Sequence, residues 1–212
     1  MLVFANHERS QPVKRKAAIE SFKSAAECIG PIEPEMSLFA LTRGQFSMLD
    51  AILHCLDQIG PSQISVWTWT IAEYEVEAMA GLMCRKDITG ARLVIDRSAD
   101  YRNKAIIDNW RELFGENQVR ICLNHAKIAR IWNDRFKILV RGSMNLNFNP
   151  RFEQFDLTEG GPDFDLVERI EEELPVLPRK YARQDAANAT GVSKAFESQQ
   201  LKMFEGIKVW AK

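Results

Sequence analysis

The sequence has few of the features that mark several common classes of protein. Its 212 residues carry 28 basic and 29 acidic side chains, a net charge of −1, so it has no overall positive field to attract nucleic acid. Its four cysteines lie far apart and form neither a Cys-x-x-Cys motif nor a cluster with histidine: Cys28, Cys55, Cys84 and Cys122. We therefore expect no structural zinc and interpret these cysteines as small core residues.

Long apolar runs are also missing. No stretch reaches the roughly 18 apolar residues of a membrane-spanning helix, and residues 1–9 become charged too early for a secretory signal. The sequence has no amphipathic helix with a strongly basic face, of the kind that binds lipid surfaces. These absences predict a cytoplasmic protein with reduced thiols and no membrane partner.

The composition that remains is that of an ordinary globular protein, with 46% hydrophobic and 27% charged residues. We divide the chain into an N-terminal arm (1–36), a domain (37–175) and a helical C-terminal extension (176–212). The arm has a basic cluster at 14–16, which either lies in solvent or contacts phosphates or a partner subunit, and a helix is expected over about 17–28. The extension carries apolar residues at helical spacing, which favours docking on its own domain or on a dimer partner: Leu201, Phe204, Ile207 and Trp210.

Strand and helix patterns alternate between these two ends. We predict a helix that begins at a capping box of Thr42 and Gln45 and ends at Gly60. Strands are then predicted over 63–71, 91–96 and 118–123, and helices over 73–85 and 103–114. This alternation predicts an α/β fold with a mixed β-sheet flanked by helices. Trp67 and Trp69 share one face of the first of these strands, and we interpret both as core residues.

A β-hairpin is predicted next, with arms over 124–132 and 135–141 and a turn at Asn133 and Asp134. In an extended strand His125 and Lys127 point to the same side of the sheet. The second arm then returns Gly142 and the residues after it to the level of His125.

The residue types that meet there suit phosphoryl chemistry without a metal. A neutral imidazole at His125 is a competent nucleophile toward phosphorus, and Lys127 supplies positive charge to the phosphoryl oxygens. Ser143 and Asn145 add hydrogen-bond donors, and Gly142 lets a phosphate approach the backbone closely. The leaving oxygen also needs a general acid, and a single His-x-Lys copy supplies only one histidine.

His125-Ala126-Lys127 together with Gly-Ser-Met-Asn-Leu-Asn at 142–147 resembles the His-Lys-Asp motif of the phospholipase D superfamily, roughly H-x-K-x4-D-x6-G-S-x-N. The resemblance covers about residues 40–160, one repeat unit of that family. It implies a phospholipase D-like single repeat that hydrolyses phosphodiesters through a phosphohistidine, without metal or cofactor. Single-motif members resemble nucleases more than lipid hydrolases, so nucleic acid is the expected substrate, and a homodimer would bring two motifs together.

The resemblance also implies roles for residues outside the motif. An acidic residue that orients the histidine follows the motif in the family, and here Glu153 is the first choice and Asp156 the second. Gly142, Asn147 and Asp156 are expected to contact substrate. So is Thr70, because the carboxyl end of the first strand borders the active site in related folds, and Tyr74 is an alternative to it.

The sequence departs from the family pattern in two places. Trp132 stands where the motif has its aspartate, and the spacing from histidine to glycine is three residues longer, which we interpret as a lengthened hairpin turn with Asp134 as the nearest aspartate. The predicted site lies at the hairpin rather than beyond the carboxyl ends of strands, where open α/β sheets usually bind ligands. A catalytically silent protein that binds DNA or a protein partner through the same pocket is the alternative function. A purely structural role would be favoured if His125 proved buried.

Overall fold

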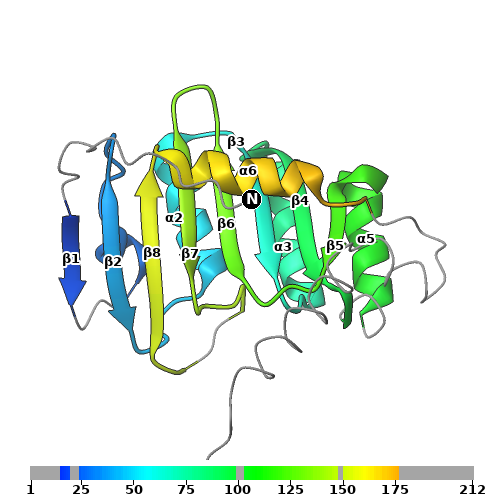
Figure 1. Cartoon of the computed structure of the whole chain (residues 1–212), viewed down its shortest axis with the longest axis horizontal. Coiled ribbons are helices and arrows are strands. Elements are labelled where there is room, and N and C mark those ends of the chain that lie inside the picture. The colour runs from blue at the N-terminus through cyan, green and yellow to red at the C-terminus, as the bar shows by residue number, and fades with distance from the viewer. Residues whose placement is uncertain (1–14, 20–23, 99–102, 148–149, 177–212) are drawn as a thin grey trace, which may run out of the picture.

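The computed structural model describes residues 15–19, 24–98, 103–147 and 150–176, and these form one mixed sheet of eight strands with helices on both faces (Figure 1). The strands are β1 (Arg15–Ile19), β2 (Ser37–Thr42), β3 (Ser62–Thr68), β4 (Ile88–Asp96), β5 (Val119–Cys122), β6 (Lys127–Trp132), β7 (Lys137–Gly142) and β8 (Glu153–Glu159). The helices are α1 (Ala25–Ile29), α2 (Met48–Ile59), α3 (Glu73–Cys84), α5 (Lys104–Phe114), the 3-10 helix η1 (Glu116–Gln118) and α6 (Pro162–Glu173). The α/β class predicted from the sequence is confirmed.

The strand order is β1-β2-β8-β7-β6-β3-β4-β5. Strands β3, β4 and β5 run parallel, as do β1 and β2, and the strands from β2 through β8, β7 and β6 to β3 pair antiparallel. The carboxyl ends of β2, β3, β4, β5 and β7 therefore meet the amino ends of β6 and β8 at one edge of the sheet. We call this line of strand ends the lower edge, after its place in Figure 1; the term does not refer to an outermost strand.

One face of the sheet forms the main hydrophobic core with α2, α3 and α5. Strand side chains alternate between faces, and the inward set of every central strand is apolar and buried, as with Ile64, Leu93, Val140 and Phe155. The helices pack against this face with apolar residues at helical spacing, and Trp110 of α5 is fully buried. None of the helices in the described part of the chain is long and apolar enough to cross a membrane.

The opposite face mixes charged residues with buried apolar ones such as Val94 and Leu139, and it carries α6, which crosses the strands in front of the sheet in Figure 1. Glu171 of α6 is fully buried and accepts hydrogen bonds from Ser65 (2.7 Å), Trp67 (3.0 Å) and Arg92 (2.9 Å). Arg130 of β6 pairs with Glu168 of α6 at 2.5 Å, and its guanidinium lies 4.5 Å from the ring centroids of Trp132 and Phe164. An acidic helix is thus held on a basic sheet face by buried ion pairs.

Most of the predicted elements are confirmed with shifted ends, and two predictions are wrong. The helix expected over about 17–28 begins only at Ala25, because residues 15–19 extend as β1 and pair with β2. The capping box of α2 is formed by Ser47 and Asp50, not by Thr42 and Gln45, which bond within their own turn. The C-terminal extension and its apolar spacing lie outside the described residues, except for Val176.

Candidate functional site

The predicted catalytic residues converge on the lower edge. Lys127 is the first residue of β6 and pairs directly with Gly142, the last residue of β7. His125 lies in the short loop that joins β5 to β6 rather than in the strand itself, and its side chain is exposed. Because β6 runs antiparallel to β3, this loop meets the carboxyl ends of β3 and β4. The expected separation between the hairpin site and the carboxyl ends of the strands is therefore wrong: the two coincide.

Asn124 holds the loop that carries His125. Its backbone N–H donates to the Asp96 carboxylate at the end of β4 (2.8 Å), and its side-chain amide donates to the carbonyl oxygen of Thr68 at the end of β3 (3.1 Å). The Asn124 side-chain oxygen accepts from the backbone N–H of Ala126 (2.9 Å). Asn124 and Asp96 are only 5% and 8% exposed. The histidine loop is thus fixed to the ends of two core strands by a buried polar cluster.

His125 and Lys127 are in contact. The Lys127 Nζ lies 3.5 Å from His125 Nδ1 and donates to the His125 carbonyl oxygen at 2.9 Å. The Trp69 ring lies on another side of the imidazole, with 6.2 Å between ring centroids and a tilt of 49°. The predicted pairing of His125 and Lys127 holds, although the contact arises from a loop next to a strand and not from two positions within one strand.

Lys127 is unusual among lysines in being buried, with only 9% of its surface exposed. Burial lowers the pKa of its ammonium group, and the negative charge of Glu153 opposes that shift. Both groups lie at the level where β6, β7 and β8 meet the lower edge. A phosphoryl group that displaced water here would meet a cation whose charge is weakly screened.

Ser143 lies between Lys127 and β8 in the lining of the same surface. Its hydroxyl donates to the Glu153 carboxylate, and it accepts from the backbone N–H of Gln154 at 3.0 Å. The Ser143 backbone N–H donates to the Gln154 carbonyl oxygen at 2.9 Å. Glu153 thus accepts a hydrogen bond from Ser143, and its charge acts on Lys127, while its predicted orientation of His125 stays a prediction.

Gly142 is required by the packing of β7 on β8. A Cβ atom at this position would lie 2.1 Å from the Gln154 carbonyl oxygen and 2.8 Å from the Phe155 Cα. These are backbone atoms of a central strand and cannot move aside cheaply. Close approach of two strands therefore accounts for the glycine, whereas we expected it to admit a phosphate.

The loop after Gly142 alternates between core and surface. Met144 and Leu146 are buried, Asn145 is half-buried, and Asn147 is exposed. The carbonyl oxygens of Asn145 and Leu146 accept from the first backbone N–H groups of α2, Met48 (3.1 Å) and Leu49 (3.4 Å). The two apolar residues anchor the loop in the core, so that its polar residues stay at the lower edge.

An open pocket of about 390 Å³ lies at this junction. It is lined by residues of β6, β7 and β8 and by the residues that adjoin β6 and β7: Ala126, Lys127, Ile128, Arg141, Gly142, Ser143, Gln154 and Asp156. Asp156 accepts a hydrogen bond from the side chain of Gln154 and faces the pocket with Arg141, which pairs with Asp163 of α6. The pocket thus joins the sequence-predicted Lys127, Gly142, Ser143 and Asp156 in one surface.

One predicted residue, Thr70, is not among those that line the pocket, and three residues near His125 were not predicted as part of the site. Thr70 is half-buried and its hydroxyl accepts from Asn103 at 3.4 Å, so its predicted contact with substrate stays a prediction. The sequence reasoning missed the positioning pair Asn124 and Asp96 and assigned Trp69 to the core. Two signals were available: Asn124 directly precedes the histidine, and Asp96 is a carboxylate that ends an apolar strand.

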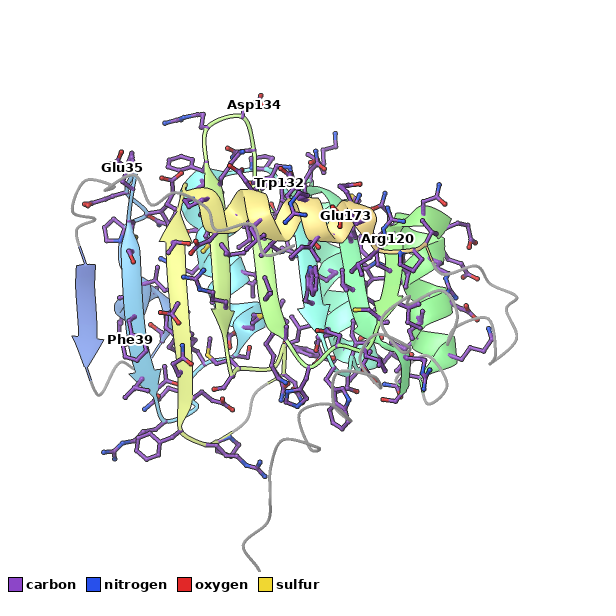
Figure 2. The ribbon with its side chains drawn as sticks, in the orientation of Figure 1. Glu35, Phe39, Arg120, Trp132, Asp134 and Glu173 are labelled. Carbon is purple, nitrogen blue, oxygen red and sulfur yellow. The ribbon has the colours of Figure 1, made fainter. Side chains whose placement is uncertain are left out.

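Trp132 lies at the far end of β6, about 16 Å along the strand from Lys127 at an ordinary rise per residue. Its ring packs edge-on against Phe164 of α6, with 6.1 Å between centroids. Figure 2 shows Asp134 at the tip of the hairpin, on the side of the sheet opposite the lower edge. The position of the motif's aspartate is therefore used here to pack α6, and Asp134 is remote from His125.

Within the described residues, no three His, Cys, Asp or Glu side chains gather so as to hold a metal ion. The cysteines there are unpaired, and burial raises the pKa of Cys28 to about 11 and of Cys55 to about 12. Cys84 is exposed at the end of α3.

No protein-family model matches the sequence, and no significant match to a curated protein sequence was found. Among solved structures, NucT from Helicobacter pylori matches with a TM-score of 0.46 and 13% identity, over 66% of this chain and 96% of NucT. Polyphosphate kinase from Porphyromonas gingivalis matches with a TM-score of 0.48 and 15% identity, over 70% of this chain and 27% of the kinase.

Phosphatidylserine synthase from Haemophilus influenzae matches with a TM-score of 0.43 and 17% identity, over 79% of this chain and 46% of the synthase. The chain thus spans nearly all of NucT but less than half of the two larger enzymes. What the structure itself shows is a mixed sheet flanked by helices.

Proposed function

We propose that this protein is a metal-independent phosphodiesterase that acts on nucleic acid. The observation that carries the proposal is the contact between an exposed histidine and a buried lysine, His125 and Lys127, beside Ser143 and an open pocket. A nucleophile next to a fixed cation and a hydroxyl donor is what attack on a phosphodiester requires. The alternation of buried and exposed residues after Gly142 keeps further donors at the same edge.

The chemistry proceeds in two steps. An imidazole nitrogen of His125 attacks phosphorus and forms a P–N bond, while the P–O bond to the leaving oxygen breaks and a general acid protonates that oxygen. Water then attacks the phosphohistidine, the P–N bond breaks, and the general acid, now a base, takes up the proton of the water. Lys127 and the Asn145 amide stabilise the charge on the phosphoryl oxygens, and the Ser143 hydroxyl joins them when it turns from Glu153 to the phosphate.

The general acid in this scheme is the His125 of a second copy of the chain. The sequence has three histidines, and within the described residues His54 is bound to the Gly30 carbonyl oxygen on the α1–α2 side (2.8 Å). The pocket beside Lys127 is open, which supports a site completed by another surface. A twofold axis near His125 would place two histidines on either side of one phosphodiester.

The test is cleavage of a labelled oligonucleotide in excess EDTA. We expect the wild type to cleave, and His125→Asn and Lys127→Ala to lose cleavage by about a hundredfold or more. A requirement for added magnesium, or full activity of His125→Asn, would refute the mechanism. The variant Phe136→Ala lies in the hairpin turn between β6 and β7, opposite the lower edge, and serves as a control that should cleave normally.

The alternative is a silent protein that holds a phosphate in the same pocket without cleaving. The observation that favours it is Trp132, which packs against α6 where the family motif has its aspartate. In that case wild type and His125→Asn bind the oligonucleotide alike and neither cleaves it, while Lys127→Ala weakens binding.

A further inference from the structure

Trp69 occupies an unusual place for a tryptophan. It directly follows β3 at the lower edge, and it remains 40% exposed although its ring lies 6.2 Å from the His125 imidazole. Trp67, two residues earlier, is only 8% exposed and donates its indole N–H to the buried Glu171. The two tryptophans are expected on the same face of one strand, but Trp67 is buried and Trp69 is exposed.

The local backbone explains why Trp69 leaves the core. β3 ends at Thr68, whose hydroxyl donates to the Thr70 carbonyl oxygen at 2.7 Å and closes a turn. Trp69 therefore no longer follows the alternation of the strand, and its ring borders the histidine loop instead. A large aromatic surface that stays accessible beside a polar site favours binding of a flat apolar group.

We propose that Trp69 stacks on an unpaired base next to the phosphodiester held by His125 and Lys127, which makes single-stranded nucleic acid the favoured substrate. The inference rests on the proposed function. In a nucleotide chain each phosphate is one sugar away from a base, so a ring beside the nucleophile meets the flanking base. In a duplex both faces of that base are already stacked, and the aromatic contact is lost unless the base leaves the helix.

The pairing of cation and ring fits this class of ligand. Sequence-tolerant binders of single strands combine positive charge along the backbone with aromatic rings under the bases. Here Lys127 supplies positive charge at the site, whereas the protein as a whole carries a net charge of −1. With so little overall electrostatic attraction, stacking contributes a large share of the affinity.

The test separates bases from phosphates. Binding is measured by fluorescence anisotropy, in EDTA and on a His125→Asn background that prevents cleavage, with oligo(dT) and with an abasic strand of the same length. Trp69→Ala should weaken the binding of oligo(dT) roughly five- to a hundredfold and leave the abasic strand within about twofold. Trp69→Phe keeps an aromatic ring and should recover most of the affinity for oligo(dT).

Phe39 provides the matched control. It is 46% exposed, close to the exposure of Trp69, but lies on β2, four strand spacings or about 19 Å from β3 across the sheet (Figure 2). Phe39→Ala should bind both strands as the parent does. Equal weakening of both strands by Trp69→Ala, or of neither, would overturn the inference.

Cleavage distinguishes this inference from the proposed function. If the wild type cleaves in EDTA but prefers duplex DNA, or binds oligo(dT) no better than the abasic strand, the stacking role is wrong and the phosphodiesterase stands. If the wild type cleaves nothing but shows the Trp69-dependent preference for oligo(dT), the phosphodiesterase is wrong and the stacking role stands.

Discussion

At the scale of single residues, Lys127 is the side chain whose chemistry depends most on its surroundings. Its burial makes it a strong local charge next to a bound phosphate, and the same burial lowers its pKa. Glu153 limits the shift and is itself held by Ser143. Lys127, which lines the pocket, thus has a lowered pKa whose shift is opposed by one carboxylate.

The lowered pKa of Lys127 predicts the alkaline limb of the pH profile. The ammonium form is present below the pKa, so phosphate binding and cleavage should decline at a pH below the ordinary lysine value of about 10.4. Lys127→Arg keeps its charge at that pH, and its profile should extend to higher pH whatever its maximal rate. The measurement is kcat/KM against pH for the two proteins. Identical alkaline limbs would show that Lys127 does not set the decline.

Asn124 is predicted to act through His125 by positioning its loop. Asn124→Ala removes the bonds to Thr68 and Ala126 and should lower kcat by about a hundredfold while changing KM little, because a shift of about 1 Å in a nucleophile has that cost. The control is Asn133→Ala. Asn133 holds the hairpin turn at the opposite end of β6 in a similar way, with its side chain accepting from Arg135 and Phe136.

Both variants should lose stability, by about 1–3 kcal/mol in urea unfolding, since each removes hydrogen bonds of an amide that is buried (Asn124) or half-buried (Asn133). Only Asn124→Ala should lose turnover. Equal kcat values for the two variants would mean that the loop is positioned by something other than Asn124.

At the scale of elements, α6 is joined to the sheet mainly by charge. Its buried Glu171 meets Arg92 at 2.9 Å and Arg130 at 3.3 Å, while Phe164 is its main apolar contact. A hydrogen bond from Arg92 lowers the pKa of the Glu172 carboxyl at the end of the same helix. That lowered pKa stabilises the fold above the unfolded-state value, and the contribution is lost as the pH falls through the folded-state pKa.

Removal of the buried carboxylate should release this helix. Glu171→Ala removes the fully buried carboxylate and leaves Arg130 and Arg92 paired with the partly exposed Glu168 and the exposed Glu172, so we expect a loss of about 3–5 kcal/mol in the free energy of unfolding, measured in urea. Glu173→Ala is the control, because its side chain is 66% exposed and its pair with Arg169 is worth about 1 kcal/mol or less. A loss of similar size in both variants would contradict the buried-network account of α6.

The same elements indicate what a sequence can and cannot predict. The helix stripes of α2 and α5 and the hairpin turn at Asn133 are local patterns, and all three are found where they were expected. β1 is not a local pattern: Ala17, Ala18 and Ile19 are compatible with a helix, and they form a strand because β2 offers a partner. Pairing with β2 therefore determines that these residues form a strand, and no local sequence pattern identifies β2 as the partner.

In the candidate site too, some contacts follow from local sequence patterns and others do not. Lys127 contacts His125 and lines a pocket with Ser143, because pairing of β6 with β7 follows from a short hairpin. The environment of Trp69 depends on where β3 ends, and a shift of one residue at a strand end exchanges core for surface. The contact of Asn124 with Asp96 joins residues 28 positions apart, which no local pattern reveals.

At the scale of the whole molecule, the proposal requires two chains for one site. A heterodimer of wild type and His125→Asn, isolated with two different affinity tags, contains one histidine in place of two. It should retain only about a few per cent of the activity of the wild-type dimer, because nucleophile and general acid are both needed in each turnover. Half of the wild-type activity would mean that each chain works alone.

The proposed mechanism depends on a covalent bond between His125 and phosphorus that forms without a metal. This bond is detected by quenching the reaction of wild-type protein with a ³²P-labelled single-stranded oligonucleotide in EDTA and mapping the label by proteolysis and mass spectrometry. We expect a label on His125 that is stable in alkali and lost in acid, and none in His125→Asn. Cleavage by the wild type with no label on His125, or with the label on another residue, would contradict it.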